Sequence, residues 1–312
     1  MSASVALSRP VPAAPSDAEA CRAILAEGSK SFATASLILP ARLRDDAAAI
    51  YAFCRIADDA VDLGDDIEAA LVMLNGRLDA VYAGTPINHP MDRAFCKAVE
   101  RHAIPRGVID ALLEGFAWDG AARRYETLED LTQYCARVAS SVGVMMSLLM
   151  GVRDRATLAR ACDLGLAMQL TNIARDVGED ARAGRVYLPL SWLTEAGLNA
   201  ASFGEKIAFD PATGQLVSRL LAEADLLYRR ADIGIAYLPA DCRFAITAAR
   251  LIYSDIGRVI EQNGFDSVSQ RASTSTVRKI WLLAKAFFGR FRARQPNTLP
   301  PDASVSFLLE SL

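Results

Sequence analysis

Residues 51–62, YAFCRIADDAVD, and residues 168–180, MQLTNIARDVGED, repeat one arrangement of polar side chains in two distant parts of the chain. An α-helix turns about 100° per residue, so polar side chains at these spacings fall within roughly 60 to 80° of arc. Each stretch therefore predicts one polar stripe on an otherwise apolar helix. The first stripe is Tyr51, Arg55, Asp58 and Asp62, and the second is Gln169, Asn172, Asp176 and Asp180.

The residues around both stripes are almost all apolar, which is typical of helices buried inside a protein rather than of solvated charged faces. A carboxylate in such a place must be ion-paired, hydrogen-bonded or bound to a cation. Gly64 and Gly184 are typical helix stop signals, and they place Asp62 and Asp180 near helix C-termini, where a negative charge is unfavourable. A bound divalent cation would reverse that cost. The two stripes together therefore predict one metal site.

The other metal-ligating residue types indicate which cation this site would hold. The two histidines, His89 and His102, stand in unrelated contexts, and the six cysteines form no C-x-x-C pair. Oxygen ligands without histidine or thiolate favour magnesium, with manganese as an alternative. The cysteine spacing also favours reduced thiols and a cytosolic setting.

Basic and hydroxyl side chains beside the stripes indicate what the cation would act on. Magnesium usually bridges carboxylates to substrate phosphates and stabilises negative charge on a departing oxygen, so we interpret the stripes as a site that ionises a diphosphate ester. Arg55, Arg175, Arg185 and Tyr187 are candidate diphosphate ligands, because guanidinium groups match phosphate oxygens. For Arg175, a salt bridge to Glu179 four residues later is an equally good interpretation.

Two further segments have both a functional and a structural interpretation. In SKSF, residues 29–32, the hydroxyl groups could contact phosphate or cap a helix. In YCARVASSVGVMM, Tyr134, Val138 and Ser141 share a helix face, which is more often part of a core than of a ligand cavity.

Composition excludes several classes of protein. A net charge of −3 over 312 residues gives no electrostatic reason to expect nucleic-acid binding. The first fifteen residues lack a basic region followed by a long apolar one, so we expect a disordered tail and no secretion signal. The apolar segments 141–152 and 280–288 are shorter than the ~20 residues of a spanning helix. We therefore expect that the protein is not integral to a membrane.

Apolar residues recur at helical spacing almost throughout the chain, which predicts an all-α fold. We expect a disordered tail over 1–16, one helical domain over 17–292, and a loose C-terminal tail over 293–312, which contains the Pro-rich stretch QPNTLPPDAS. The expected helices are 17–35, 41–63, 66–82, 89–102, 107–120, 127–150, 155–180, 192–197, 211–237, 240–263 and 274–291.

Several of these segments together resemble the squalene and phytoene synthases, and most closely the bacterial phytoene synthases. The resemblance extends from about Cys21 to Phe288. The second acidic motif with its RVYLP continuation is highly specific, whereas DDAVD alone is weak. The matching segments are SKSF at 29–32, DDAVD at 58–62, YCARVASSVG at 134–143, QLTNIARDVGEDARAGRVYLP at 169–189 and ARLIYSDIGRVIEQNGFD at 249–266.

The resemblance implies an isoprenoid-synthase fold, with helices around a central cavity, and a role for each matching residue. Magnesium would be held on the substrate diphosphates by Asp58, Asp62, Asn172, Asp176 and Asp180. Gln169 matches a position lining the same site, and Ser31 and Phe32 match the front of the pocket. The positions that would contact diphosphate are Tyr51, Arg55, Arg175, Tyr187 and Arg271.

The implied reaction is head-to-head condensation of two geranylgeranyl diphosphate molecules through a cyclopropylcarbinyl diphosphate, prephytoene diphosphate, to phytoene. This is the first committed step of carotenoid biosynthesis, and it would need no NADPH. A dry apolar cavity is necessary, because water would quench each carbocation. Ala139, Ser140 and Ser141 depart from a Gly-Thr pair that is frequent in the family, which concerns pocket depth more than reaction type.

Two alternatives stay open at this stage. The chain could be a head-to-head synthase that uses farnesyl diphosphate to make squalene, dehydrosqualene or presqualene diphosphate. It could also be a helical assembly factor without catalytic activity, although none of the motif acids is missing. A phosphohydrolase of the histidine-aspartate type is set aside, because two isolated histidines cannot supply its ligands.

The product of the implied reaction would be very apolar, and the segment KIWLLAKAFFGRFRAR, residues 279–294, is amphipathic. We therefore expect a cytoplasmic protein that associates transiently with the inner face of the membrane. The sequence leaves the oligomeric state open.

Overall fold

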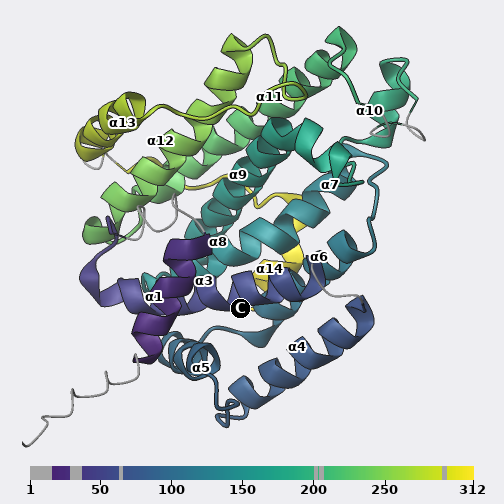
Figure 1. Cartoon of the computed structure of the whole chain (residues 1–312). Helices are drawn as coiled ribbons and strands as arrows, with labels where there is room; N and C mark the ends of the chain where they lie inside the picture. Colours follow the sequence, from purple (N-terminus) through teal and green to yellow (C-terminus); the bar gives the residue numbers. More distant parts are fainter. Residues whose placement is uncertain (1–15, 29–36, 63–65, 200–202, 204–206, 290–293) are drawn as a thin grey trace, which may run out of the picture.

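The chain folds into helices that pack around the long helix α9, Arg155–Arg182 (Figure 1). The computed structural model describes residues 16–28, 37–62, 66–199, 203, 207–289 and 294–312. Within these ranges the structure has helices and no strand, which confirms the all-α prediction. The other α-helices are α1 (Asp17–Gly28), α3 (Ala41–Asp62), α4 (Ile67–Tyr82), α5 (Pro90–His102), α6 (Arg106–Gly120), α7 (Leu128–Cys135), α8 (Ser141–Leu149), α10 (Leu190–Glu195), α11 (Pro211–Ile235), α12 (Ala240–Gln262), α13 (Thr276–Gly289) and α14 (Ser306–Glu310).

The two helices that carry the stripes belong to different parts of this arrangement. Helix α9 packs against α11, α8 and α12, whereas α3 packs against α1, α5 and α6. The sides of α9 away from its stripe enter the core through Leu166, Leu170 and other apolar residues that are almost fully buried. Gly165 makes this packing close, because a Cβ there would lie 2.8 Å from the backbone oxygen of Ala139. The two stripes therefore lie on helices that have different packing partners.

Residues 127–150, expected as one helix, form three consecutive segments. Helix α7 begins after a capping box in which Thr127 accepts from the backbone of Asp130 and Asp130 accepts from that of Thr127. A π-helical turn, Ala136–Ser140, then separates α7 from α8. Ser140 donates from Oγ to the carbonyl of Cys162 on α9 at 2.9 Å, so this turn packs directly against α9. π-Helical turns of this kind are frequent near functional sites.

The C-terminal residues depart from the expected loose tail. A short 3-10 helix, Ala303–Val305, leads into α14, and Val305, Leu308 and Leu309 are buried. The carbonyl of Pro300 accepts hydrogen bonds from Arg160 on α9 and Arg230 on α11. The Pro-rich composition predicted a mobile segment, but these buried contacts hold it against the helical core.

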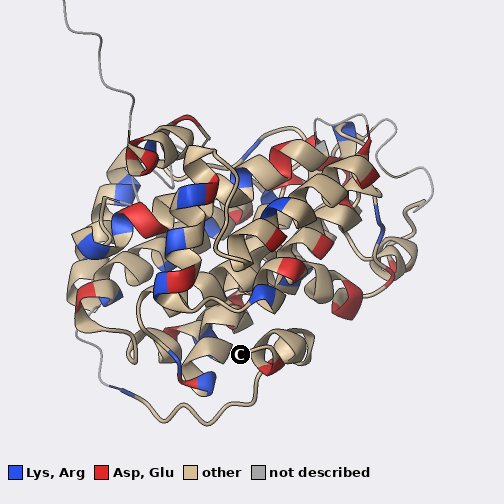
Figure 2. Cartoon of the chain, turned by 90° about the horizontal axis from the view of Figure 1, so that it is seen from below, with Lys and Arg blue, Asp and Glu red and all other residues tan. Residues whose placement is uncertain are grey.

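Basic and acidic residue positions are interspersed along the helices in the view of Figure 2. This agrees with the small net charge of the chain. Among the described residues, no helix is both long and apolar enough to span a bilayer.

Candidate active site

The α9 stripe ends in the last turn of the helix, as the sequence predicts. Gly184 adopts φ 78°, a left-handed conformation that suits glycine, and the backbone N–H of Arg185 donates to the carbonyl of Asp180 at 2.8 Å. About two helical turns earlier along the stripe, the side-chain amide of Asn172 donates to Oε1 of Gln169 at 3.4 Å. The stripe therefore presents amide and carboxylate oxygens in a row that stops where the helix stops.

Asp176 is held by two arginines. The Nε atoms of Arg175 and Arg271 each donate to its Oδ1 atom at 2.8 Å. Burial raises the pKa of the Asp176 carboxyl, but the hydrogen bonds from Arg175 and Arg271 outweigh burial and leave the pKa below its ordinary value. An ion pair between Arg175 and Glu179 is one interpretation of the sequence. In the structure Arg271 pairs with Glu179, and the distance between its Nε and Oε2 of Glu179 is 3.1 Å.

Arg271 reaches Asp176 because the segment after α12 lies directly against α9. The backbone N–H of Gly178 donates to the carbonyl of Ser267 at 3.0 Å, although it lies within a helix. A Cβ on Gly178 would lie 2.5 Å from the carbonyl oxygen of Val268, so only glycine allows this approach. Arg182 also donates to the Val268 carbonyl, at 3.2 Å. These contacts fix the segment that carries Arg271.

Asp180 is in a different electrostatic state from Asp176. Burial, followed by the negative charges of Asp176 and Asp119, raises its pKa to about 7, and Arg185 only partly offsets this. Asp180, Arg185 and Tyr187 line one small pocket, whose other walls are apolar side chains of α9 and of the segment after it. Near neutral pH this carboxyl therefore carries a proton part of the time.

Asp119, in the last turn of α6, is a site residue that the sequence analysis missed. Its two carboxylate oxygens accept hydrogen bonds from the hydroxyls of Tyr187, at 2.6 Å, and Tyr134, at 2.7 Å. The rings of these tyrosines stack with centroids 5.2 Å apart, and Tyr125 stacks on Tyr187 at 6.2 Å. A signal existed, because Asp119 precedes Gly120 after an apolar run, the pattern that drew attention to the other acids.

The α3 stripe is more exposed than the α9 stripe. Arg55 forms ion pairs with Asp59 at 2.6 Å and with Asp58 at 3.5 Å, so Asp59 joins the stripe although the sequence analysis did not select it. Tyr51 lies at the end of α1, since a Cβ on Gly28 would lie 2.6 Å from the Tyr51 hydroxyl. The predictions for Ser31, Phe32 and the side chain of Asp62 lie outside the described residues.

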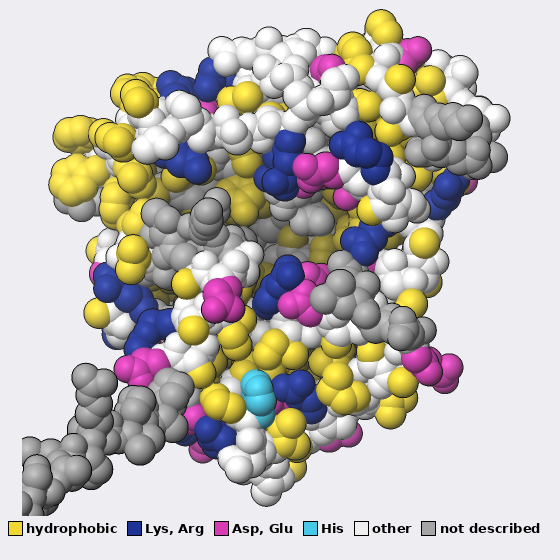
Figure 3. All heavy atoms as spheres, in the orientation of Figure 1, with side chains coloured by type: hydrophobic (Ala, Val, Ile, Leu, Met, Phe, Trp, Pro, Cys, Tyr) yellow, Lys and Arg dark blue, Asp and Glu magenta, His cyan; other side chains and the backbone are white. Residues whose placement is uncertain are grey.

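Tyr253 on α12 lies near charged residues of the α9 stripe. Burial raises the pKa of its hydroxyl, Arg175 opposes this, and the negative charge of Asp176 adds to it. On the face shown in Figure 3 the surface is hollowed near its centre, and acidic and basic side chains gather on both sides of the hollow.

The donor atoms fit a hard divalent cation by their chemistry. The stripes offer carboxylate and amide oxygens. Burial, together with the charge of Asp176, disfavours ionised Asp180, and a bound cation would offset that cost. Outside the gaps in the described chain, no three His, Cys, Asp or Glu side chains stand close enough together to hold a metal. Because the Asp62 side chain falls in such a gap, the metal ligands stay a prediction.

Comparisons of the chain with known proteins all point to the same family. The family model described as "Squalene/phytoene synthase" matches residues 25–278. The phytoene synthase of Rhodobacter capsulatus is 50% identical over 276 residues, covering 88% of this chain and 81% of that protein. The phytoene synthase of Cereibacter sphaeroides is 50% identical over 313 residues, which cover 96% of this chain and 88% of that protein. The 15-cis-phytoene synthase of Pantoea ananas is 42% identical over 288 residues, which cover 88% of this chain and 93% of that protein.

Solved structures agree with this result. A dehydrosqualene synthase in complex with ligand superposes with a TM-score of 0.79 at 33% identity, covering 87% of this chain and 95% of that one. The squalene synthase HpnC from Alicyclobacillus acidocaldarius superposes with a TM-score of 0.73 at 26% identity, covering 80% of this chain and 94% of that one.

Proposed function

We propose, from the premise that this chain belongs to the squalene/phytoene synthase family, that it condenses two molecules of geranylgeranyl diphosphate to phytoene. The observation that carries the choice of substrate is the 42 to 50% identity to phytoene synthases over most of the chain. The arginine-held Asp176 beside the more weakly ionised Asp180 supports diphosphate chemistry at the stripes.

The basic residues around Asp176 bind and orient the diphosphate groups. Arg175 and Arg271 donate to Asp176 from two different segments, and we assign Arg55 and Tyr51 of α3 to the same group of diphosphate ligands. Guanidinium groups pre-positioned in this way stabilise a departing diphosphate without reorganisation during the reaction. Magnesium, when bound by Asp58, Asp62, Asn172, Asp176 and Asp180, would supply further charge neutralisation of the leaving group.

The condensation proceeds in two ionisations. Loss of diphosphate from the first substrate gives an allylic cation, and the C2=C3 double bond of the second substrate attacks it. Loss of a proton closes the cyclopropane ring of prephytoene diphosphate. A second diphosphate departs, the carbon skeleton rearranges, and a second proton is lost to give phytoene without a reductant. Released diphosphate is our candidate for the base.

Stacked aromatic rings would exclude water from these cations. Tyr125 and Tyr134 are almost fully buried, and the hydroxyls of Tyr134 and Tyr187 both point at Asp119. The hydroxyls of Tyr134 and Tyr187 are therefore already hydrogen-bonded, and the stacked rings would form a dry wall beside the site. Aromatic faces also attract positive charge, which stabilises a carbocation.

A second candidate reaction is condensation of farnesyl diphosphate to a C30 product. The superposition with a dehydrosqualene synthase at 33% identity favours it over other prenyl chemistry. Both reactions use the same two ionisations, so the length of the apolar cavity would decide between them.

The deciding experiment incubates the purified chain with magnesium and either geranylgeranyl or farnesyl diphosphate, with and without NADPH. Hydrocarbons are then extracted and identified by mass. We expect phytoene from the C20 substrate in the absence of NADPH. A C30 product from farnesyl diphosphate alone would support the second candidate, and no product from either substrate would refute both.

A further inference from the structure

Helix α13 directs its apolar stripe to the solvent. Val277, Ile280, Trp281, Phe287 and Phe288 recur at helical spacing, and this pattern normally faces a core. In the structure they are exposed, with Val277 at 79%, Trp281 at 50% and Phe288 at 73%. We call these five residues the α13 ridge. An exposed apolar surface of this kind typically marks an interaction site.

The ridge is held rigidly on the body of the protein. Leu282 and Ala286, on the opposite side of α13, are buried against the fold. Phe287 packs edge to face on Phe244 of α12 with ring centroids 6.1 Å apart. Near the start of α13, Arg278 donates from Nε to Oδ1 of Asp255 at 2.9 Å. The exposed aromatic residues therefore protrude from an anchored helix.

Basic side chains accompany the ridge. The Arg278 guanidinium lies 4.3 Å from the centre of the Trp281 ring, and the Lys285 ammonium lies 5.5 Å from it. Lysine, arginine and tryptophan beside an apolar face are typical of a helix that lies in a membrane interface.

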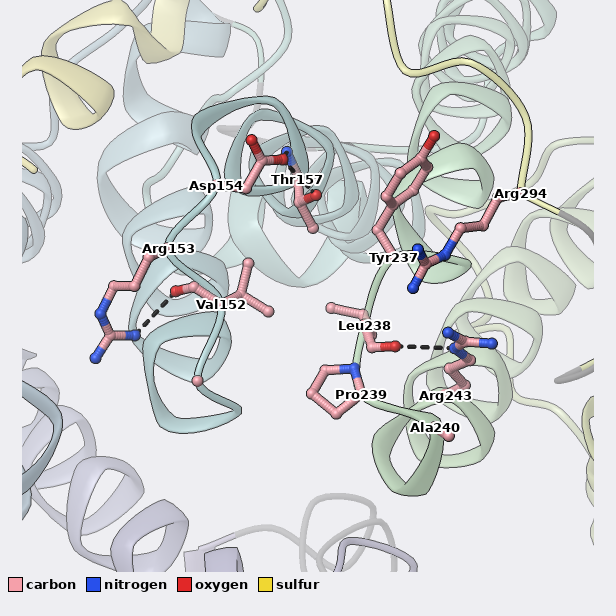
Figure 4. A pocket seen from close by; sticks show the side chains of 11 residues that line it. Val152, Arg153, Asp154, Thr157, Tyr237, Leu238, Pro239, Ala240, Arg243 and Arg294 are labelled. Carbon is pink, nitrogen blue, oxygen red and sulfur yellow. Dashed lines mark hydrogen bonds between the residues drawn. The ribbon is translucent and has the colours of Figure 1, made fainter.

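A cleft of about 570 Å³ is lined by residues of the α8–α9 and α11–α12 connections, by Arg243 of α12 and by Arg294, which follows α13 in the chain (Figure 4). Arg243, next to the Phe244 that packs on the ridge, donates from Nε to the carbonyl of Leu238 at 2.9 Å. Arg294, five positions after the end of α13, donates from Nε to the carbonyl of Ala236 at 3.2 Å. These bonds fix two guanidinium groups beside one turn of the chain, although like charges repel.

The remaining charges of the cleft leave it positive. Arg153 is fixed on the opposite wall by the carbonyls of Leu148 and Val152, both at 2.9 Å. Asp154 is the one acid in the lining, and its Oδ2 accepts from the backbone and hydroxyl of Thr157. Three arginines and one aspartate give the lining a formal charge of +2, which suits a phosphate group.

We propose that the α13 ridge and the basic cleft form one docking surface for an anionic phospholipid bilayer. The ridge inserts its aromatic and aliphatic side chains among the acyl chains, and the cleft holds a phosphate headgroup. Apolar burial and the attraction of basic residues to anionic lipid contribute together. The surface is a binding site separate from the acidic stripes.

This surface is connected to the site by a short path along the chain. Arg271, which donates to Asp176, stands five positions before the start of α13. A docked α13 would therefore place the site close to the bilayer, where a hydrocarbon product could leave. That consequence rests on the proposed function, but lipid binding itself does not.

The test is co-sedimentation of the purified chain, without substrate, with vesicles of phosphatidylcholine alone or with about 30% phosphatidylglycerol. We expect binding to the anionic vesicles and roughly tenfold weaker binding for Trp281→Ser/Phe288→Ser and for Arg243→Gln/Arg294→Gln. The matched controls are Val72→Ser/Met73→Ser, two exposed apolar residues of α4, and Arg229→Gln, a surface cation of α11. These controls should bind as the unaltered chain does.

The outcomes separate the two parts of the proposal. No binding to either vesicle, or equal losses in the control variants, would overturn the docking surface. If inorganic phosphate at millimolar concentration binds the free chain and Arg243→Gln removes that binding without changing vesicle affinity, the cleft takes a soluble anion and its assignment to a headgroup is wrong. Since these measurements need no turnover, a chain inactive with both prenyl diphosphates could still pass them.

Discussion

Arg271 lies 95 positions after Asp176 in the chain, and its Nε donates to the Oδ1 of Asp176 at 2.8 Å. The same guanidinium lies 3.1 Å from Glu179, one helical turn further along α9. Arg271 is half-exposed, whereas Asp176 is largely covered. The contact therefore joins a buried acidic stripe to a solvent-facing cation that can also meet an incoming diphosphate.

The first prediction concerns this arginine. Arg271→Lys keeps the positive charge but removes the planar pair of donors, so we expect the KM for geranylgeranyl diphosphate to rise about tenfold with a smaller change in kcat. Steady-state kinetics measures both parameters, with Arg229→Gln as the control. An unchanged KM would mean that Arg271 has only a structural role.

The second prediction concerns the carboxylate itself. Asp176→Asn removes the charge that Arg175 and Arg271 bind and one predicted magnesium ligand, so we expect kcat to fall by about a thousandfold. Circular dichroism should show an unchanged helical fold. The control, Asp225→Asn, changes an exposed carboxylate of α11. Full activity in Asp176→Asn would refute the assignment of the stripe.

The third prediction follows from the pKa of Asp180. Its value of about 7 in the folded chain lies above that of an unfolded aspartate, so the folded state binds this proton more tightly. This contribution to stability is fully present below pH 4 and is lost as the pH rises to 7. In metal-free buffer, we expect the free energy of unfolding of the unaltered chain to fall between pH 5 and pH 8. The decrease should be larger than that of Asp180→Asn by on the order of 2 kcal/mol.

Urea unfolding at the two pH values checks this expectation. The depressed pKa of Asp176 acts in the opposite direction in both proteins, so it cancels in the comparison. Added magnesium should reduce the difference, because a bound cation favours the ionised carboxylate. If the free energy of unfolding depends on pH equally in both proteins, the pKa of Asp180 is not raised in the folded chain.

The fourth prediction tests the close approach at Gly178. A Cβ there would meet the backbone of Val268, so Gly178→Ala must displace the segment that carries Arg271. We expect a loss of stability of about 1 to 3 kcal/mol together with reduced turnover. Gly76→Ala in α4 is the matched control, since nothing lies within 4 Å of its added Cβ. That change should stabilise the chain by about 1 kcal/mol.

The fifth prediction concerns Asp119 and its two tyrosines. Tyr134→Phe and Tyr187→Phe each leave one carboxylate oxygen without its donor, and each should lower kcat by roughly tenfold. The loss of kcat in the double variant should differ from the product of the two single losses, because both hydroxyls bind the same carboxylate. Additive effects in a double-mutant cycle would contradict a shared role.

Sequence periodicity was sufficient to predict the all-α class and the polar stripe on α9, because each depends on local spacing within individual helices. It did not reveal Asp119 or Tyr253, since each contributes one side chain from a helix without a repeated motif. The fixed C-terminal segment was missed for a related reason. Its position depends on hydrogen bonds from Arg160 and Arg230, which lie far away in sequence, and on burial of Val305, Leu308 and Leu309 against the folded core.

That C-terminal segment also sets an order of events during synthesis. Asp163 is completely buried, with Arg160 and Arg230 as its ion-pair partners, and both arginines also bind the carbonyl of Pro300. While a ribosome is still translating the chain, these arginines lack that partner and the apolar cover supplied by α14. The central helices can form early, but their final packing must wait until residues 300–309 have emerged.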